Sequence, residues 1–144
     1  MSDTRLDLSA LREAVSALED GLEVVSDTEW INAQSSKVRN TLISGVIQGF
    51  EFVYEISVKM IKRQIEAQSA SPDEVDKSDF RELLRAAAEK GLISNVEAWF
   101  GYRKMRNITA HTYDREKAQQ VYHNTLTFIN DARALLHTLE ERNA

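Results

Sequence analysis

Residues 36–68 read SKVRNTLISGVIQGFEFVYEISVKMIKRQIEAQ, a long run without a proline. Apolar side chains recur in it near the 3.6-residue period of an α-helix. They are Val38, Leu42, Val46, Phe50, Val53, Ile61 and Ile65. We predict one helix over these residues, far longer than the average of about eleven or twelve residues. A helix of this length is expected to kink or to be covered by a partner along its length.

Two glycines in the same run, Gly45 and Gly49, lie four positions apart. Because glycine has no Cβ, a stretch with this spacing lets a second helix approach closely. The spacing is a membrane signature only in apolar segments, and this run carries too much charge for that meaning. We expect a close helix crossing here, at a dimer axis.

The segments on either side also carry helical periodicity. Before the long helix, apolar residues repeat at spacings of three and four. They are Leu8, Leu11, Val15, Leu18, Leu22 and Val25. The cluster Ser26–Thr28 is expected to end this first helix.

After the long helix, turn and cap signals divide the chain. Pro72 follows Ser71 and suits the first position of a new helix. A short helix over about 79–90 is expected to stop at Gly91, the residue type typical of a helix C-terminus. Ser94 and Glu97 have capping-box spacing and predict a helix that runs toward Ala110.

A last helix follows a break at residues 112–114. Its apolar stripe is Ala118, Val121, Thr125, Ile129, Ala132, Leu136 and Leu139. No stretch alternates with period two, and glycine and proline total only six residues. The sequence therefore predicts an all-α, up-and-down bundle of about four to five helices, with residues 1–144 as a single domain.

Composition limits the chemistry. There is no cysteine, which excludes disulfides, thiol catalysis and cysteine zinc sites. The N-terminus lacks a signal-peptide pattern, and charges interrupt the apolar stretch 42–58. We expect a cytoplasmic protein with no membrane partner, no cofactor and no metal.

The charge is uneven. The net charge is −5, so the whole chain is not a strongly basic nucleic-acid binder. Residues 56–65 and 101–117 are nevertheless basic. If these two stretches face each other, they form a positive groove in an acidic protein.

One histidine has suggestive neighbours. Arg106, Asn107, His111 and Tyr113 put a cation, an amide, an imidazole and a phenol within eight residues. Such groups suit cleavage of RNA without a metal, in which an imidazole moves protons and a guanidinium stabilises the phosphate. His123 and His137 have no acidic or hydroxyl partner set at suggestive spacing in the sequence.

Spacing alone leaves this interpretation open. Five helical residues turn the chain by about 500°, so Arg106 and His111 would lie some 140° apart on a regular helix. A bent terminal turn or a second copy across a two-fold axis could bring them together. Alternatively, His111 only favours the helix dipole and Arg106 only pairs with an acid.

The residues Arg106-x4-His111-x-Tyr113 resemble the R-x4-H-x-Y signature of HEPN domains of the HepT type. Two further stretches, at 48–55 and 88–93, resemble the nucleotidyltransferase substrate-binding protein family of that group. The similarity spans roughly residues 5–140. It implies a HEPN-like bundle that forms a homodimer. It also implies a partner protein, a small nucleotidyltransferase encoded nearby.

The resemblance also implies roles for residues. In one picture the chain is the toxin of a toxin–antitoxin pair, a metal-independent endoribonuclease. Arg106 and His111 are then catalytic and Asn107 orients the groups. The antitoxin transfers AMP to Tyr113, the nucleotidyl acceptor. In the alternative picture the chain is a substrate-binding or adaptor module without RNase activity, so the sequence leaves open whether it is an enzyme.

Four more residues are candidates for lining the groove: Gln48, Glu51, Glu55 and Arg103. Glu51 and Glu55 lie four apart on one helical face without metal-ligating company, and Glu55 is also spaced for an ion pair with Lys59. A purely structural helical adaptor is a third interpretation, in which Arg106 and His111 lie on unrelated surfaces.

Overall fold

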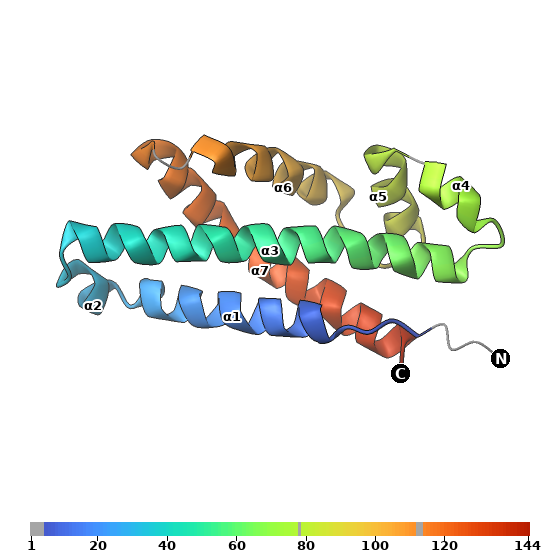
Figure 1. Cartoon of the computed structure of the whole chain (residues 1–144), viewed down its shortest axis with the longest axis horizontal. Helices are drawn as coiled ribbons and strands as arrows, with labels where there is room; N and C mark the ends of the chain where they lie inside the picture. The colour runs from blue at the N-terminus through green and yellow to red at the C-terminus, as the bar shows by residue number, and fades with distance from the viewer. Residues whose placement is uncertain (1–4, 78, 112–113) are drawn as a thin grey trace.

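The computed structural model describes residues 5–77, 79–111 and 114–144. In these ranges every regular element is a helix and none is a strand, which confirms the predicted all-α class. Five helices have ten or more residues, and the chain order is shown in Figure 1. The elements are α1 (Ser9–Ser26), α2 (Thr28–Asn32), α3 (Ser36–Gln68), α4 (Pro72–Lys77), α5 (Phe80–Glu89), α6 (Val96–Ile108), the 3₁₀ turn η1 (Thr109–His111) and α7 (Arg115–Arg142).

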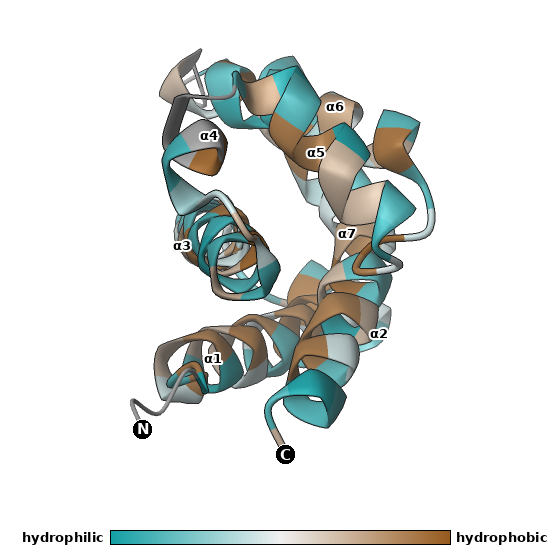
Figure 2. Ribbon diagram, turned by 90° about the vertical axis from the view of Figure 1, so that its right-hand side faces the viewer, coloured by the Kyte–Doolittle hydropathy of each residue, from teal (hydrophilic) through white to brown (hydrophobic). Residues whose placement is uncertain are grey.

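Helix α3 is the central element. It runs unbroken from Ser36 to Gln68, the predicted bounds, and spans the molecule (Figure 1). Helix α1 packs along one side of α3, and α4, α5 and α6 lie along the other (Figures 1 and 2). Helix α7 crosses α3 from the end of α6 to the start of α1 (Figure 1). From Val46 onward α3 buries side chains against helices of its own chain, whereas no residue from Ser36 to Gly45 is buried. No helix in the described ranges is long and apolar enough to cross a membrane.

Aromatic rings join α3, α6 and α7 at the centre of the bundle. Phe50 and Tyr102 each meet the ring of Phe128 edge-on, with centroids 4.8 Å apart. Trp99, which is 2% exposed, packs edge-on against Tyr102. Edge-to-face pairs add about 0.5–1.5 kcal/mol beyond area burial. This cluster holds α6 firmly against α3, which positions the end of α6.

The two glycines of α3 have different surroundings. A Cβ on Gly49 would lie 3.1 Å from Leu18 Cδ1, so the close approach predicted here comes from α1 of the same chain. A Cβ on Gly45 would meet nothing within 4 Å. The expected crossing with a second copy is thus untested at Gly45 and is not needed to explain Gly49.

Local signals placed most helix ends correctly. Gly91 has φ of +75°, and the amides of Gly91 and Leu92 donate to the carbonyls of Ala88 and Ala87. This is the Schellman arrangement that glycine permits, and it ends α5 as predicted.

Two expectations about helix starts need correction. The residue that caps α6 is Asn95 and not Ser94, because the Asn95 side chain accepts from Ala98 N at 3.1 Å. Helix α2 was not predicted. It begins because Asp27 Oδ1 accepts from Trp30 N, so the polar cluster that ends α1 also starts a further turn.

Candidate functional site

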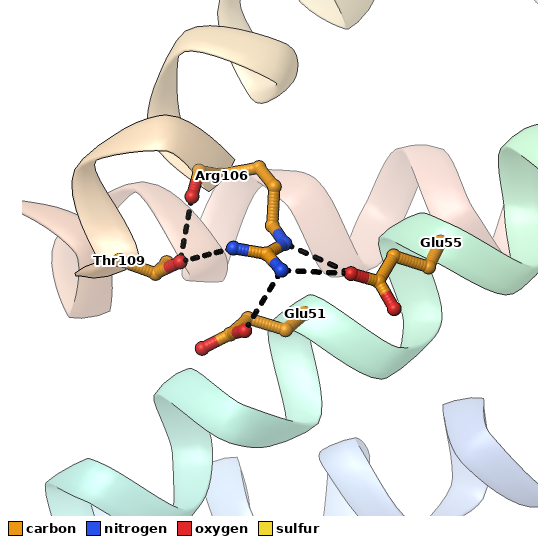
Figure 3. Close-up of polar contacts among 4 residues, drawn as sticks. All are labelled: Glu51, Glu55, Arg106 and Thr109. Atoms are coloured by element: carbon orange, nitrogen blue, oxygen red, sulfur yellow. Dashed lines mark hydrogen bonds and ion pairs between the residues drawn. The ribbon is translucent and has the colours of Figure 1, made fainter.

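The side chain of Arg106 lies at the crossing of α6 and α3 (Figure 3). Its Nε and Nη2 both donate to Glu55 Oε1, at 3.0 and 2.9 Å. Nη2 also lies 3.4 Å from Glu51 Oε2. The two glutamates are four residues apart on α3, so one helical face presents both carboxylates to the guanidinium. The structure thus brings three of the predicted site residues together.

Thr109 completes this arrangement and was not predicted. Arg106 Nη1 donates to Thr109 Oγ1 at 2.9 Å, and that hydroxyl donates to the carbonyl oxygen of Arg106 at 2.6 Å. Thr109 is the C-cap of α6 and is only 5% exposed. Its i,i+3 spacing from Arg106 is the sequence signal that could have identified it. The threonine fixes the plane of the guanidinium relative to the helix end.

Glu55 does not pair with Lys59 as expected, because its Oε1 binds Arg106 instead. One guanidinium therefore faces two carboxylates, a local formal charge of −1. Of the five N–H donors of arginine, three make hydrogen bonds, to Glu55 and Thr109, and the second N–H of Nη2 belongs to the ion pair with Glu51. The site as it stands is an anchored cation with little free donor capacity.

The cluster is partly open to solvent. The side chains of Arg106, Glu51 and Glu55 are 33%, 28% and 53% exposed. Exposed ion pairs contribute only about 0.2–1 kcal/mol each, because water screens them and side-chain entropy opposes them. A competing anion can therefore exchange with Glu55 at small cost, whereas Glu51 is more enclosed.

Two buried tyrosines lie beneath the site. Burial raises the pKa of Tyr54, and the charges of Arg103 and Arg106 partly oppose this shift. Burial also raises the pKa of Tyr102, together with its hydrogen bond to Asp131. Both phenols stay protonated at neutral pH.

The remaining motif residues follow the end of α6. His111 is the last residue of η1, the tightened turn in which the helix ends close to the expected position. The structure describes the backbone of His111 and not its side chain, and Tyr113 lies outside the described residues. The proximity of the Arg106 and His111 side chains stays a prediction.

The other candidates lie around the cluster. Gln48 is exposed on α3, one turn before Glu51. Arg103 and Asn107 are exposed and line a hollow between α5 and α6, whereas Arg106 reaches toward α3. The last turns of α6 therefore present polar side chains on two faces, one toward α5 and one toward α3. Among the described residues there is no group of three or more acidic or histidine side chains that could hold a metal ion.

Comparison with known proteins gives consistent results. Residues 6–141 match the family model described as nucleotidyltransferase substrate binding protein like. The chain is 43% identical over 143 residues to "Probable ribonuclease HepT" from Haemophilus influenzae, covering 99% of this chain and 98% of that protein. A solved structure, HI0074 from Haemophilus influenzae, superposes with a TM-score of 0.91 at 43% identity, covering 93% of this chain and 99% of that one. That structure is described as the fold of a substrate-binding domain of a nucleotidyltransferase.

Proposed function

Since this chain belongs to the nucleotidyltransferase substrate-binding protein family, we propose that it is a HEPN-type subunit that works with a small nucleotidyltransferase. We propose further that it cleaves single-stranded RNA without a metal ion, at the interface of a homodimer. The name of its relative as a probable ribonuclease supports this. The resemblance to HEPN domains, carried by Arg106 and His111, supports it as well.

One observation carries the proposal. The guanidinium of Arg106 is held from three sides at the surface, by Glu55, Glu51 and Thr109. A group that is held in place before substrate arrives needs little reorganisation when charge develops in a transition state.

The reaction needs only the groups of the motif. The RNA 2′-oxygen attacks the adjacent phosphorus and the bond to the 5′-oxygen breaks, which leaves a cyclic phosphate and a free 5′-hydroxyl. His111 accepts the proton of the 2′-hydroxyl, and a second imidazole returns a proton to the 5′-oxygen. Arg106 stabilises the negative charge on the phosphate oxygens. Asn107 orients these groups. A dimer supplies both imidazoles.

The homodimer is supported by an exposed face of α3. Val38 and Phe52 are 38% and 53% exposed, and Gly45 lies midway between them with open space around it. Spacings of seven residues put all three on one face of the helix. Phe52 directly follows Glu51, so a second copy packed on this face would border the Arg106 cluster. A two-fold axis would then present two copies of the motif to one RNA.

The nucleotidyltransferase is the proposed regulator, as the antitoxin of a cytoplasmic toxin–antitoxin pair. The Tyr113 oxygen attacks the α-phosphorus of ATP and loses its proton, and pyrophosphate leaves, so that the AMP adds a phosphate close in sequence to Arg106 and His111. That phosphate is an anion for which RNA must compete, so modification silences cleavage. Incubation of both proteins with ATP, followed by mass mapping, should place one AMP on Tyr113. If Tyr113 stays unmodified, the proposed regulation by AMP transfer is wrong, and the nuclease proposal has to be judged without it.

The nuclease is tested with labelled single-stranded RNA in EDTA. We expect cleavage by the wild type and loss of cleavage in His111→Ala and Arg106→Ala. His137→Ala is the matched control, because His137 pairs with Glu141 on the exposed end of α7. Equal cleavage by wild type and His111→Ala, or none by either, would refute the nuclease.

A second function is favoured by the charge of the site. Because two carboxylates already neutralise Arg106, the chain could serve its partner as a substrate-binding module without turning over RNA. That function predicts binding of the nucleotidyltransferase that survives His111→Ala and no RNA cleavage by any variant. The EDTA assay therefore decides between the two.

A further inference from the structure

A basic hollow of about 250 Å³ lies between α5 and α6, outside the Arg106 cluster. Its lining is Phe80, Arg81, Phe100, Arg103, Lys104 and Asn107. The lining thus contains three cations, one amide and two aromatic rings, and no acidic residue. In a protein with a net charge of −5, such a concentration of positive charge needs an explanation.

The two arginines are each supported by a ring. The guanidinium carbon of Arg81 lies 4.8 Å from the centroid of Phe100, and that of Arg103 lies 4.3 Å from the centroid of Phe80. Such cation–π contacts are attractive, because the face of the ring carries partial negative charge. The rings fix the flat faces of the guanidiniums, and the N–H edges stay available to a ligand.

These cations differ from Arg106 in their partners. Within the described residues no acid pairs with Arg81, Arg103 or Lys104, whereas Arg106 faces two carboxylates. An anion that meets this surface therefore gains attraction at the hollow without displacing anything. At Arg106 it must first exchange with Glu55.

We propose that this hollow binds the phosphodiester backbone of single-stranded RNA and holds the strand beside the Arg106 site. The inference rests on the proposed function, because RNA is the substrate named there. The three cations bind phosphate oxygens, and the Asn107 amide donates to a phosphate or a sugar oxygen. The class of ligand follows from the unpaired charge and the absence of any acid in the lining.

The position of the hollow fits this role. Arg103 and Arg106 are i,i+3 neighbours on α6, so their Cβ atoms lie about 5–6 Å apart. Asn107 lines the hollow and directly follows Arg106 in the chain. One strand can therefore cross the end of α6 with one phosphate in the hollow and another at Arg106. The hollow supplies affinity and leaves the Arg106 site to act on the bound strand.

The test measures binding apart from cleavage. A fluorescent single-stranded RNA with 2′-O-methyl groups cannot be cleaved, because its 2′-oxygen is blocked. Its anisotropy gives Kd at several salt concentrations for the wild type and for Arg103→Gln/Lys104→Gln. Arg12→Gln/Lys37→Gln is the control, which removes two exposed cations from α1 and from the first turn of α3.

We expect the hollow variant to bind about 25-fold more weakly, since it loses two charge contacts and each is worth roughly a factor of five in water. The slope of log K against log salt should fall by about 1.4, because each lost phosphate contact removes about 0.7 for a single strand. Arg103→Lys/Lys104→Arg keeps both charges and should retain most of the affinity. Circular dichroism checks that all variants fold.

The proposal is overturned if the hollow variant keeps the wild-type Kd and salt slope, or if the control loses as much affinity as the hollow variant. A hollow that instead receives an acidic protein surface would give the first of these results. Failure of cleavage in EDTA leaves this binding result unchanged, so the two proposals fail separately.

Discussion

Glu55→Gln should strengthen RNA binding although it breaks an ion pair. Glu55 Oε1 accepts from both Nε and Nη2 of Arg106 and is the most exposed acid of the cluster. The amide oxygen of glutamine can still accept these hydrogen bonds, so the guanidinium keeps its position. The change raises the local formal charge from −1 to 0 at the phosphate site that we propose.

The magnitude follows from Coulomb's law. A phosphate on the free side of the guanidinium would lie about 6 Å from the Glu55 carboxylate, which corresponds to a repulsion of roughly 0.7 kcal/mol in water. Removing it should tighten RNA binding about threefold, and more if the bound strand excludes solvent. The free energy of unfolding should fall by less than about 1 kcal/mol, the usual range for an exposed pair.

The assay is anisotropy with 2′-O-methyl RNA at low salt, beside urea denaturation. Glu19→Gln is the matched control, because Glu19 pairs with Arg133 at 3.1 Å on another surface and its loss changes the net charge equally. If Glu55→Gln binds RNA no tighter than Glu19→Gln, Glu55 does not compete with phosphate and the reasoning about Arg106 is wrong.

Three further predictions concern stability and assembly. Gly91→Ala should lower the free energy of unfolding by about 1–2 kcal/mol, since φ of +75° disfavours any side chain. Gly101→Ala has open space in α6 and should raise it by up to about 1 kcal/mol. Equal urea midpoints for the two variants would contradict this. Tyr102→Phe should lower the free energy of unfolding by about 1–2 kcal/mol, because it removes the hydrogen bond to Asp131, and Tyr122→Phe is the control. Folding raises the pKa of Tyr102, so this tyrosine contributes fully to the free energy of unfolding below pH 10 and less as the pH rises above 10. The wild type should therefore lose more stability between pH 9 and 11 than Tyr102→Phe. Phe52→Gln should lower self-association in sedimentation while leaving unfolding within about 0.5 kcal/mol, and Leu126→Gln, on an exposed part of α7, should leave self-association unchanged.

Much of the fold could be predicted because its signals are local. The bounds of α3 follow from an uninterrupted apolar period between Ser35, which caps its start, and the loop before Pro72. The stop at Gly91 follows from the one residue type that adopts positive φ without strain. The errors were also local. Asn95 and Ser94 are both good caps, and only packing decides which one lies at the helix end.

The candidate site was predictable in its residues and less so in its contacts. The motif identified Arg106, and the two glutamates of α3 were candidates. The contact itself was not predictable, because Arg106 and Glu55 are 51 positions apart in the sequence. The Glu55–Lys59 ion pair was expected because spacing within one helix reveals only partners on that helix, and Lys59 is the cation four residues after Glu55. The role of Thr109 depends on the turn at the end of α6, which periodicity does not locate to the residue.

The sequence by itself determined the helical class, most helix ends and the family motif, since backbone hydrogen bonds and apolar period depend on residues three or four apart. Only the tertiary structure decided that Arg106 meets Glu51 and Glu55 while Arg103 and Asn107 line the hollow beside α5. The physical reason is that a helix presents several faces, and which face meets which neighbour depends on the packing of the aromatic core among α3, α6 and α7. The net charge of −5 does not reveal either result, because Arg103 and Lys104 of the hollow and the neutralised Arg106 lie on different faces of one helix, α6.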